Sequence, residues 1–251
     1  MDISIFNKKD LIDMRARGIP PGEILRQLEL FAKGSPFADL LKPCRIGDGI
    51  MSLDESGISR LTAVYSKAQA SGRTMKFVPA SGAATRMFKE LSSLNDLHED
   101  INALILRERS KDNDSYKYLL IFIDNLKRFA FYDDLKSVML RDGIDIDDAL
   151  KNEKYSQILH YTLGPKGLNL AGLPKGLIPF HKYKDCSRTP FEEHMVEASA
   201  YAADRHGRTR CHFTVSAEHE RAIKIHVDSV RGRHEKSGIN FEIGYSNQKP
   251  S

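Results

Sequence analysis

Hydrophobic positions along the chain follow two different periods. Apolar residues recur every three or four positions over much of residues 8–69 and 94–163, which predicts amphipathic helices. Short apolar and β-branched runs at 75–78, 211–216 and 241–245 predict strands instead. Because helical stretches separate these strands, the pattern predicts an α/β fold with a mostly parallel sheet.

The same pattern predicts the division of the chain. Residues 1–73 are expected to form an N-terminal helical cap, in which Asn7 and Asp54 begin helices as N-caps. Residues 74–251 are expected to form the α/β domain, with a helical insertion at about 94–163. The sequence stops soon after the last predicted strand, so we expect it to be the front part of a longer protein, which intact-mass analysis of the natural product would test.

The stretch 74–89 (TMKFVPASGAATRMFK) combines a strand, a glycine turn and the expected start of a helix. Pro79 has no backbone N–H and is expected to end the strand. Gly82 supplies turn chemistry, and residues 84–91 have good helix propensity. A turn that opens a helix directs free N–H groups at one point, where the helix dipole also favours an anion.

This geometry makes the loop a candidate phosphate-binding site. Arg86 adds a guanidinium that can bind phosphate through two parallel hydrogen bonds. The alternative is a close strand-to-helix turn with no ligand, and the loop matches neither the Walker nor the dinucleotide-binding pattern. The candidate nucleotide-binding residues are Ala80, Ser81, Gly82, Ala83, Ala84 and Thr85.

Composition and charge exclude several classes of protein. A net charge of +4 without a long basic run argues against nucleic-acid binding. No apolar run approaches the length of a membrane span, and no signal peptide is visible. Cys44, Cys186 and Cys211 are scattered without CxxC spacing, which suits a reducing compartment and predicts neither a metal site nor a disulfide framework. The expected location is cytoplasmic, without a membrane partner.

Two separated segments resemble the nucleotidyltransferases that make nucleotide-diphosphate sugars. Residues 82–87 (GAATRM) are similar to the GxGTRM-type loop of that family. Residues 174–179 (PKGLIP) resemble its lysine-bearing segment, and Thr189–Pro190 opens the following helix as in the family. The Pro-Lys-Gly form of this segment is most similar to the one in the eukaryote-like UDP-sugar pyrophosphorylases. The whole chain also resembles an uncharacterised bacterial domain-of-unknown-function family with a PASGAATRMFK stretch.

The first resemblance implies a fold and an activity. It implies a Rossmann-like fold of the nucleotide-diphospho-sugar transferase type that binds a nucleoside triphosphate and a sugar phosphate, with Mg²⁺ as cofactor. The loop would hold the nucleotide phosphates, and Arg86 would neutralise the pyrophosphate leaving group. Lys175 would orient phosphate near the reacting centre. Arg86 and Lys175 are therefore the candidate catalytic residues, since positioning and cations dominate such transfers.

The chain also departs from the nucleotidyltransferase pattern. Ala84 replaces the second glycine, the insertion separates the two segments, and no residue matches the Mg²⁺-binding aspartate with confidence. The alternative function is a catalytically degenerate nucleotide- or sugar-binding module, or an interaction protein. The sequence names neither the sugar, the base nor the oligomeric state.

Other chemistry is less well supported by the sequence. His194 and Glu197 are spaced i, i+3, which permits a metal pair, but no HExxH motif or third ligand accompanies them. Glu192 and Glu193 are better interpreted as helix N-terminal charges than as an acid/base pair. Ser81 and Ser187 lack a GxSxG motif, which argues against a serine hydrolase.

Overall fold

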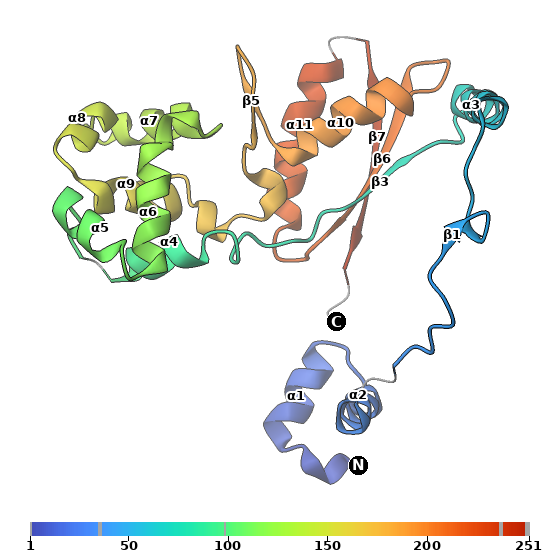
Figure 1. Ribbon diagram of the computed structural model, residues 1–251, viewed down its shortest axis with the longest axis horizontal. Coiled ribbons are helices and arrows are strands. Elements are labelled where there is room, and N and C mark those ends of the chain that lie inside the picture. Colours follow the sequence, from blue (N-terminus) through green and yellow to red (C-terminus); the bar gives the residue numbers. More distant parts are fainter. Residues whose placement is uncertain (1, 35–36, 98, 236–237, 249–251) are drawn as a thin grey trace. The chain divides into compact units, whose positions relative to one another are not determined.

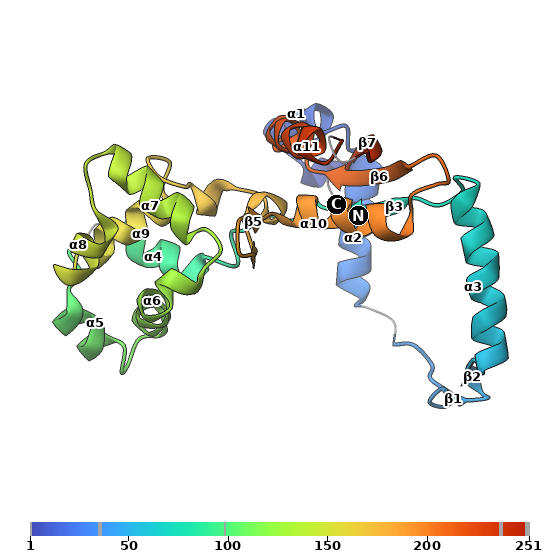
Figure 2. The ribbon, with the colours of Figure 1, turned by 90° about the horizontal axis from the view of Figure 1, so that it is seen from above.

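The computed structural model describes residues 2–34, 37–97, 99–235 and 238–248. The chain divides into two units, one within its first 62 residues and the other over Ala63–Gln248. The ribbon of each unit is drawn in Figures 1 and 2. No described helix is long and apolar enough to cross a membrane.

The first unit is built from short elements without a buried core. Asn7 caps the first α-helix as expected: its side chain accepts from the Asp10 N–H at 3.0 Å, and Asp10 accepts from the Asn7 N–H at 2.9 Å. No described residue between 2 and 62 is buried, and the Phe31 side chain is 81% exposed. Its elements are a 3-10 helix Ile3–Ile5, α1 (Lys8–Ala16), α2 (Pro21–Lys33), β1 (Arg45–Ile46), β2 (Gly49–Ile50) and the start of α3 (Glu55–Ala70).

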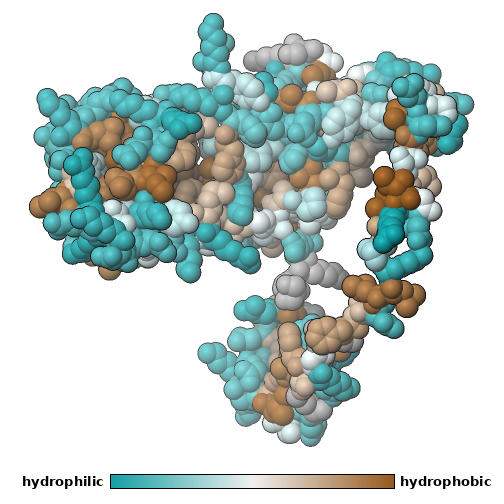
Figure 3. Space-filling view, viewed as in Figure 1, coloured by the Kyte–Doolittle hydropathy of each residue, from teal (hydrophilic) through white to brown (hydrophobic). Residues whose placement is uncertain are grey.

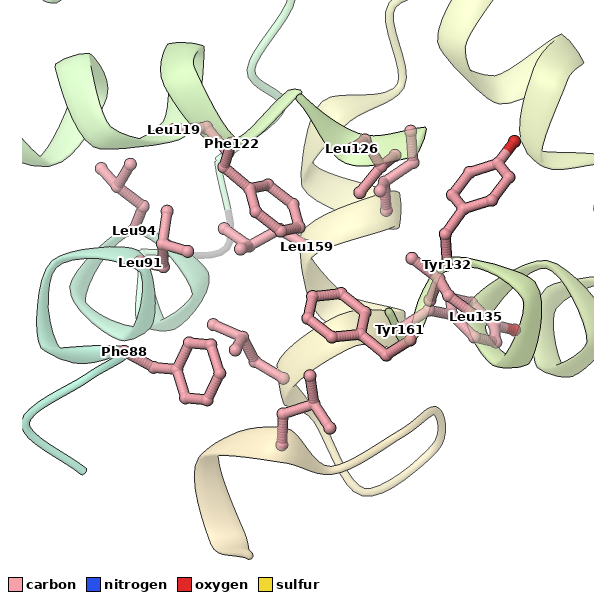
Figure 4. Close-up of a cluster of buried hydrophobic side chains, with 14 of the residues drawn as sticks. Phe88, Leu91, Leu94, Leu119, Phe122, Leu126, Tyr132, Leu135, Leu159 and Tyr161 are labelled. Atoms are coloured by element: carbon pink, nitrogen blue, oxygen red, sulfur yellow. The ribbon is translucent and has the colours of Figure 1, made fainter. Parts of the chain in front are cut away.

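The second unit contains a helical cluster with its own core. Phe88 and Leu91 point toward Leu159 and Tyr161 of α9, and Phe122 of α6 packs beside them (Figure 4). The amphipathic spacing of these residues explains the packing, because each helix turns one apolar stripe inward. The cluster comprises α4 (Lys89–Asp96), α5 (Ala103–Arg109), α6 (Asp114–Asp124), α7 (Tyr132–Arg141), α8 (Ile146–Lys151) and α9 (Tyr155–Leu163), with a 3-10 helix at Leu126–Arg128.

The second unit also contains a three-stranded parallel sheet. Its strands are β3 (Lys76–Pro79), β6 (Arg208–Val215) and β7 (Asn240–Asn247), in the order β3-β6-β7. Val78 pairs with Phe213, which in turn pairs with Tyr245. The structure therefore shows a mixed α/β fold with a small parallel sheet, as the strand and helix pattern predicts. The finer expectation of a Rossmann-like nucleotidyltransferase fold is not confirmed.

The sheet has one buried face and one exposed face. Alternate residues of β6 are buried against α10 (Pro190–Tyr201) and α11 (Glu220–Glu235), because side chains of a strand alternate between faces. On the other face, Phe77 is 57% exposed and stacks on His212 with ring centroids 5.6 Å apart. Between the helical cluster and α10 lie 3-10 helices at Leu170–Gly172 and Lys175–Leu177 and an antiparallel pair, β4 (His181–Lys182) and β5 (Ser187–Arg188).

Candidate functional site

The candidate loop leaves the sheet at the carboxyl end of β3. The Ala80 N–H still donates to the Thr214 carbonyl at 2.8 Å, so the ladder with β6 continues one residue past Pro79. The Ser81 hydroxyl then donates to the side chain of Gln248. The loop therefore starts at a fixed point on the edge where the carboxyl ends of the parallel strands meet.

The helix expected to open at Ala84 begins only at Lys89, so this prediction is wrong. Residues 84–88 form turns, in which the Met87 and Phe88 N–H groups both donate to the Ala84 carbonyl, at 2.8 and 3.3 Å. Ala84 and Phe88 are buried in the core of the helical cluster, and this anchoring holds the chain in turns. Thr85 and Arg86 consequently lie in an exposed turn, outside the first turn of α4.

The structure joins the two motif segments, residues 82–87 and 174–179. Ala83 and Pro174 form an isolated antiparallel bridge. The Lys175 N–H donates to the Gly82 carbonyl at 2.9 Å, and the Ala84 N–H donates to the Leu173 carbonyl at 3.3 Å. Lys175 is thereby fixed beside the loop, although the whole helical cluster separates the two segments in sequence.

This pairing decides which backbone donors of the loop remain free. The N–H groups of Ala80 and Ala84 are used by the fold and cannot bind a ligand as well. Within the described part of the chain, no hydrogen bond is made by the N–H groups of Ser81, Gly82, Ala83, Thr85 and Arg86. The loop can therefore donate to an anion through its exposed backbone, without help from a helix dipole.

Two glycines shape this region for different reasons. A Cβ atom added to Gly82 would meet no atom within 4 Å, so the space above Gly82 is open. A Cβ atom on Gly176 would lie 2.3 Å from a ring carbon of Phe191, which is buried. Gly176 is therefore required by packing, whereas Gly82 leaves room for a ligand atom.

A cavity of about 200 Å³ lies beside the loop and is lined by Gly82, Lys175, Phe191 and His194, among others. His194 comes from α10, the helix that Thr189 caps by accepting from the Glu192 N–H at 3.3 Å. The sequence indicates His194 only as half of a metal pair, and its place in the same cavity lining as Lys175 becomes visible only in the structure. The signal in the sequence is the Thr189–Pro190 motif, which opens the next α-helix after the lysine segment.

His194 and Glu197, the pair whose spacing permits a metal site, make other contacts in the structure. Glu197 forms an ion pair with Lys76, and this hydrogen bond is the main cause that lowers the pKa of the Glu197 carboxyl. His194 Nδ1 lies 3.5 Å from a Glu197 carboxylate oxygen and makes no hydrogen bond. The described residues contain no group of three metal-ligating side chains.

The residues of the loop cavity do not fit the Mg²⁺ ion implied by the resemblance. Magnesium in proteins is usually bound through one or two carboxylates together with substrate phosphates. Among the described residues, the cavity that holds Gly82 and Lys175 has no carboxylate in its lining. Its polar side chains are an ammonium group and an imidazole, which suit an anion rather than a hard cation.

The two candidate catalytic residues face different cavities. Lys175 lines the cavity of about 200 Å³, whereas Arg86 lines a second one of about 680 Å³. The same two chain segments, around 80–91 and 174–180, contribute walls to both cavities. The structure thus brings Arg86 and Lys175 to one region of the molecule without placing them on a common cavity wall.

A polar cluster around the buried Glu192 joins α10 to α11. The Glu192 carboxylate, 8% exposed, lies 3.1 Å from an Arg233 nitrogen and 3.2 Å from His234 Nε2. Thr189 Oγ1 lies 2.7 Å from His226 Nε2, and burial lowers the pKa of His226. Glu192 therefore has partners on the neighbouring helix and is not left free for acid/base chemistry.

These features define a mixed α/β protein in which a glycine loop with free backbone donors follows the first strand of a small parallel sheet. The chain belongs to the family described as domain of unknown function (DUF4301), whose model matches residues 7–251. This confirms the expectation of a domain-of-unknown-function family. Searches of curated proteins and of solved structures found no match.

Proposed function

We propose that the loop of residues 81–86 binds the phosphates of a nucleoside triphosphate and that the protein transfers a nucleotidyl group to a sugar phosphate. The observation that carries the proposal is the hydrogen-bonded pairing at Ala83 and Pro174. It joins the two segments that resemble the nucleotidyltransferases, and it leaves the neighbouring N–H groups free.

The proposed chemistry uses charges that lie in this region. An oxygen of the sugar phosphate attacks the α-phosphorus, and the bond to the pyrophosphate leaving group breaks. The free N–H groups near Gly82 donate to phosphate oxygens, and Lys175 acts on them as a point charge. Arg86 offsets the charge of the leaving pyrophosphate through bidentate hydrogen bonds. Neither cation has a carboxylate partner among the described residues, so both charges are available.

A binding module without catalysis is the second candidate. It is favoured by the absence of any carboxylate from the described lining of the loop cavity, which leaves no carboxylate ligand there for a catalytic Mg²⁺ ion. In this case the protein binds the nucleotide or the nucleotide sugar and releases it unchanged.

The test is a thermal-shift and titration panel of nucleoside triphosphates and nucleotide sugars, with and without Mg²⁺. A ligand present at a hundred times its dissociation constant should stabilise the protein by about 2.7 kcal/mol. We expect Arg86→Ala and Lys175→Ala to weaken binding about tenfold or more, since hydrogen bonds to charged groups are worth roughly 1.5–3 kcal/mol. Lys111→Ala, an exposed position outside both cavities, is the matched control.

Pyrophosphate release in the presence of a sugar phosphate separates the two candidates. Release that depends on Arg86 supports nucleotidyl transfer, whereas nucleotide binding without release supports the binding module. The absence of binding by every nucleotide, on a folded chain, would overturn both.

A further inference from the structure

The larger cavity has the size and lining of a site for a small organic ligand. Its volume of about 680 Å³ falls within the range of roughly 300–1,000 Å³ that is typical of ligand sites. Its apolar wall includes Ile121 of α6, Phe129 before α7 and Phe180 beyond the lysine segment. The space-filling view shows hydrophobic residues gathered on one face of the helical cluster (Figure 3). The cavity can therefore take an apolar body of considerable size.

Three cations line the same cavity: Arg86, Lys89 and Arg128. Among the described residues, none of the three forms an ion pair with a carboxylate, and the Arg128 guanidinium donates only to the Asn125 side-chain oxygen, at 2.9 Å. The adjacent Lys127, in contrast, is paired with Asp147 at 2.7 Å. The lining of this cavity thus carries three cations that have no carboxylate partner among the described residues.

Two carboxylates, Glu90 and Asp114, also belong to the lining. Glu90 is occupied by the Ser115 hydroxyl, which donates to it at 2.7 Å. The cations outnumber the carboxylates, and arginine binds carboxylate and phosphate groups in bidentate geometry. The lining therefore favours an anionic head group over a cationic one.

We propose that this cavity binds an anion carried on an apolar body, with a carboxylate or phosphate head held by Arg128 and Lys89. The body, an alkyl chain or an aromatic ring system, lies against Ile121, Phe129 and Phe180. This cavity is separate from the loop cavity but contains Arg86, which the proposed function assigns to the pyrophosphate. The head group is therefore assigned to Arg128 and Lys89 alone, and the proposal does not rest on nucleotide binding.

The experiment uses paired probes on the full chain. Decanoate is compared with decan-1-ol, and 2-naphthoate with 2-naphthylmethanol, so that each pair shares a body and differs in charge. Isothermal titration measures all four, and the naphthalene probes are also followed by fluorescence because the chain has no tryptophan. We expect each anion to bind about tenfold or more tightly than its neutral partner. Whether decanoate or 2-naphthoate binds more tightly shows whether the apolar body is an alkyl chain or an aromatic ring system.

Two variants locate the binding. Arg128→Gln should remove most of the preference for the anion, and Ile121→Glu, at a half-exposed position, should weaken both anions about tenfold or more. Lys117→Gln, on α6 but outside the lining, should change nothing. Equal binding of anionic and neutral probes would overturn the anionic head, and failure of both anions to bind would overturn the site. Arg86 is left unchanged, so nucleotide binding can be scored separately.

Discussion

The Lys175 N–H donates a hydrogen bond of 2.9 Å to the Gly82 carbonyl, and this contact joins the two sides of the candidate site. The first side leaves the sheet at β3 and enters the helical cluster. The second leaves the helical cluster and leads back toward α10 and the sheet. A ligand held by both sides would therefore couple the helical cluster to the sheet, a role consistent with the proposed nucleotide site.

Two glycine substitutions test this geometry. Gly176→Ala should reduce the free energy of unfolding by about 1–3 kcal/mol, because its new methyl group would overlap the buried Phe191 ring. Gly82→Ala should change stability by less than about 0.5 kcal/mol, since the space beside Gly82 is open. Urea denaturation of both variants measures these effects.

The Gly82 variant also tests the loop as a binding site. If phosphate approaches the Gly82 backbone, the added methyl group should weaken nucleotide binding while stability is retained. Unchanged affinity for a nucleotide that binds the wild type would place the phosphate elsewhere.

His226 should make stability depend on pH. Burial lowers its pKa in the folded protein, whereas an unfolded histidine has a pKa of about 6.5. As the pH falls, this histidine is therefore protonated in the unfolded chain at a higher pH than in the folded protein. The free energy of unfolding should consequently decrease as the pH drops from about 7.5 through 6.5. In His226→Gln this loss should be smaller, whereas the exposed His181→Gln should retain it. Denaturant unfolding of all three proteins between about pH 7.5 and 5.5 measures the difference.

The helices and strands that depend on neighbouring residues in the sequence were predictable from the sequence. The strand at β6 follows from alternating residues such as Cys211 and Phe213, and the helix starts follow from caps such as Asn7 and Thr189. The start of α4 could not be predicted, because burial of Ala84 and its hydrogen bond to Leu173 are tertiary contacts that override helix propensity.

The candidate site was predictable only in its two motif segments. The sequence identified Arg86 and Lys175, but their assignment to separate cavities depends on how residues 84–88 turn. Arg128 carries no motif, and it reaches the larger cavity only because the helical cluster folds back on the loop. Such sites arise from packing between distant segments, which periodicity and spacing do not encode.

The three thiols should differ in reactivity. Cys44 and Cys186 are exposed, whereas Cys211 lies in the buried face of β6, and burial raises its pKa to about 12. Because the thiolate is the nucleophile, Ellman's reagent should label only the first two in the native protein. Cys186→Ser should then leave a single reactive thiol, and denaturant should expose Cys211 in both proteins. Rapid reaction of Cys211 in the native protein would contradict the burial of this face.

Asp204 should make the free energy of unfolding depend on pH in the acid range, separately from His226. Its carboxylate accepts from the backbone N–H groups of Arg208 at 3.0 Å and His206 at 2.8 Å, and from the Arg208 guanidinium at 2.9 Å. The backbone hydrogen bond from Arg208 is the largest cause that lowers the pKa of Asp204 to about 2.

An unfolded aspartate has a pKa of about 3.9, so the stabilisation is complete above that pH and is lost as the pH falls toward 2. Asp204→Asn should be less stable than the wild type at neutral pH and lose less stability in that acid window. The exposed Asp13→Asn should keep the acid loss of the wild type. If the wild type and Asp204→Asn lose stability in parallel as the pH falls, these hydrogen bonds do not stabilise the folded carboxylate.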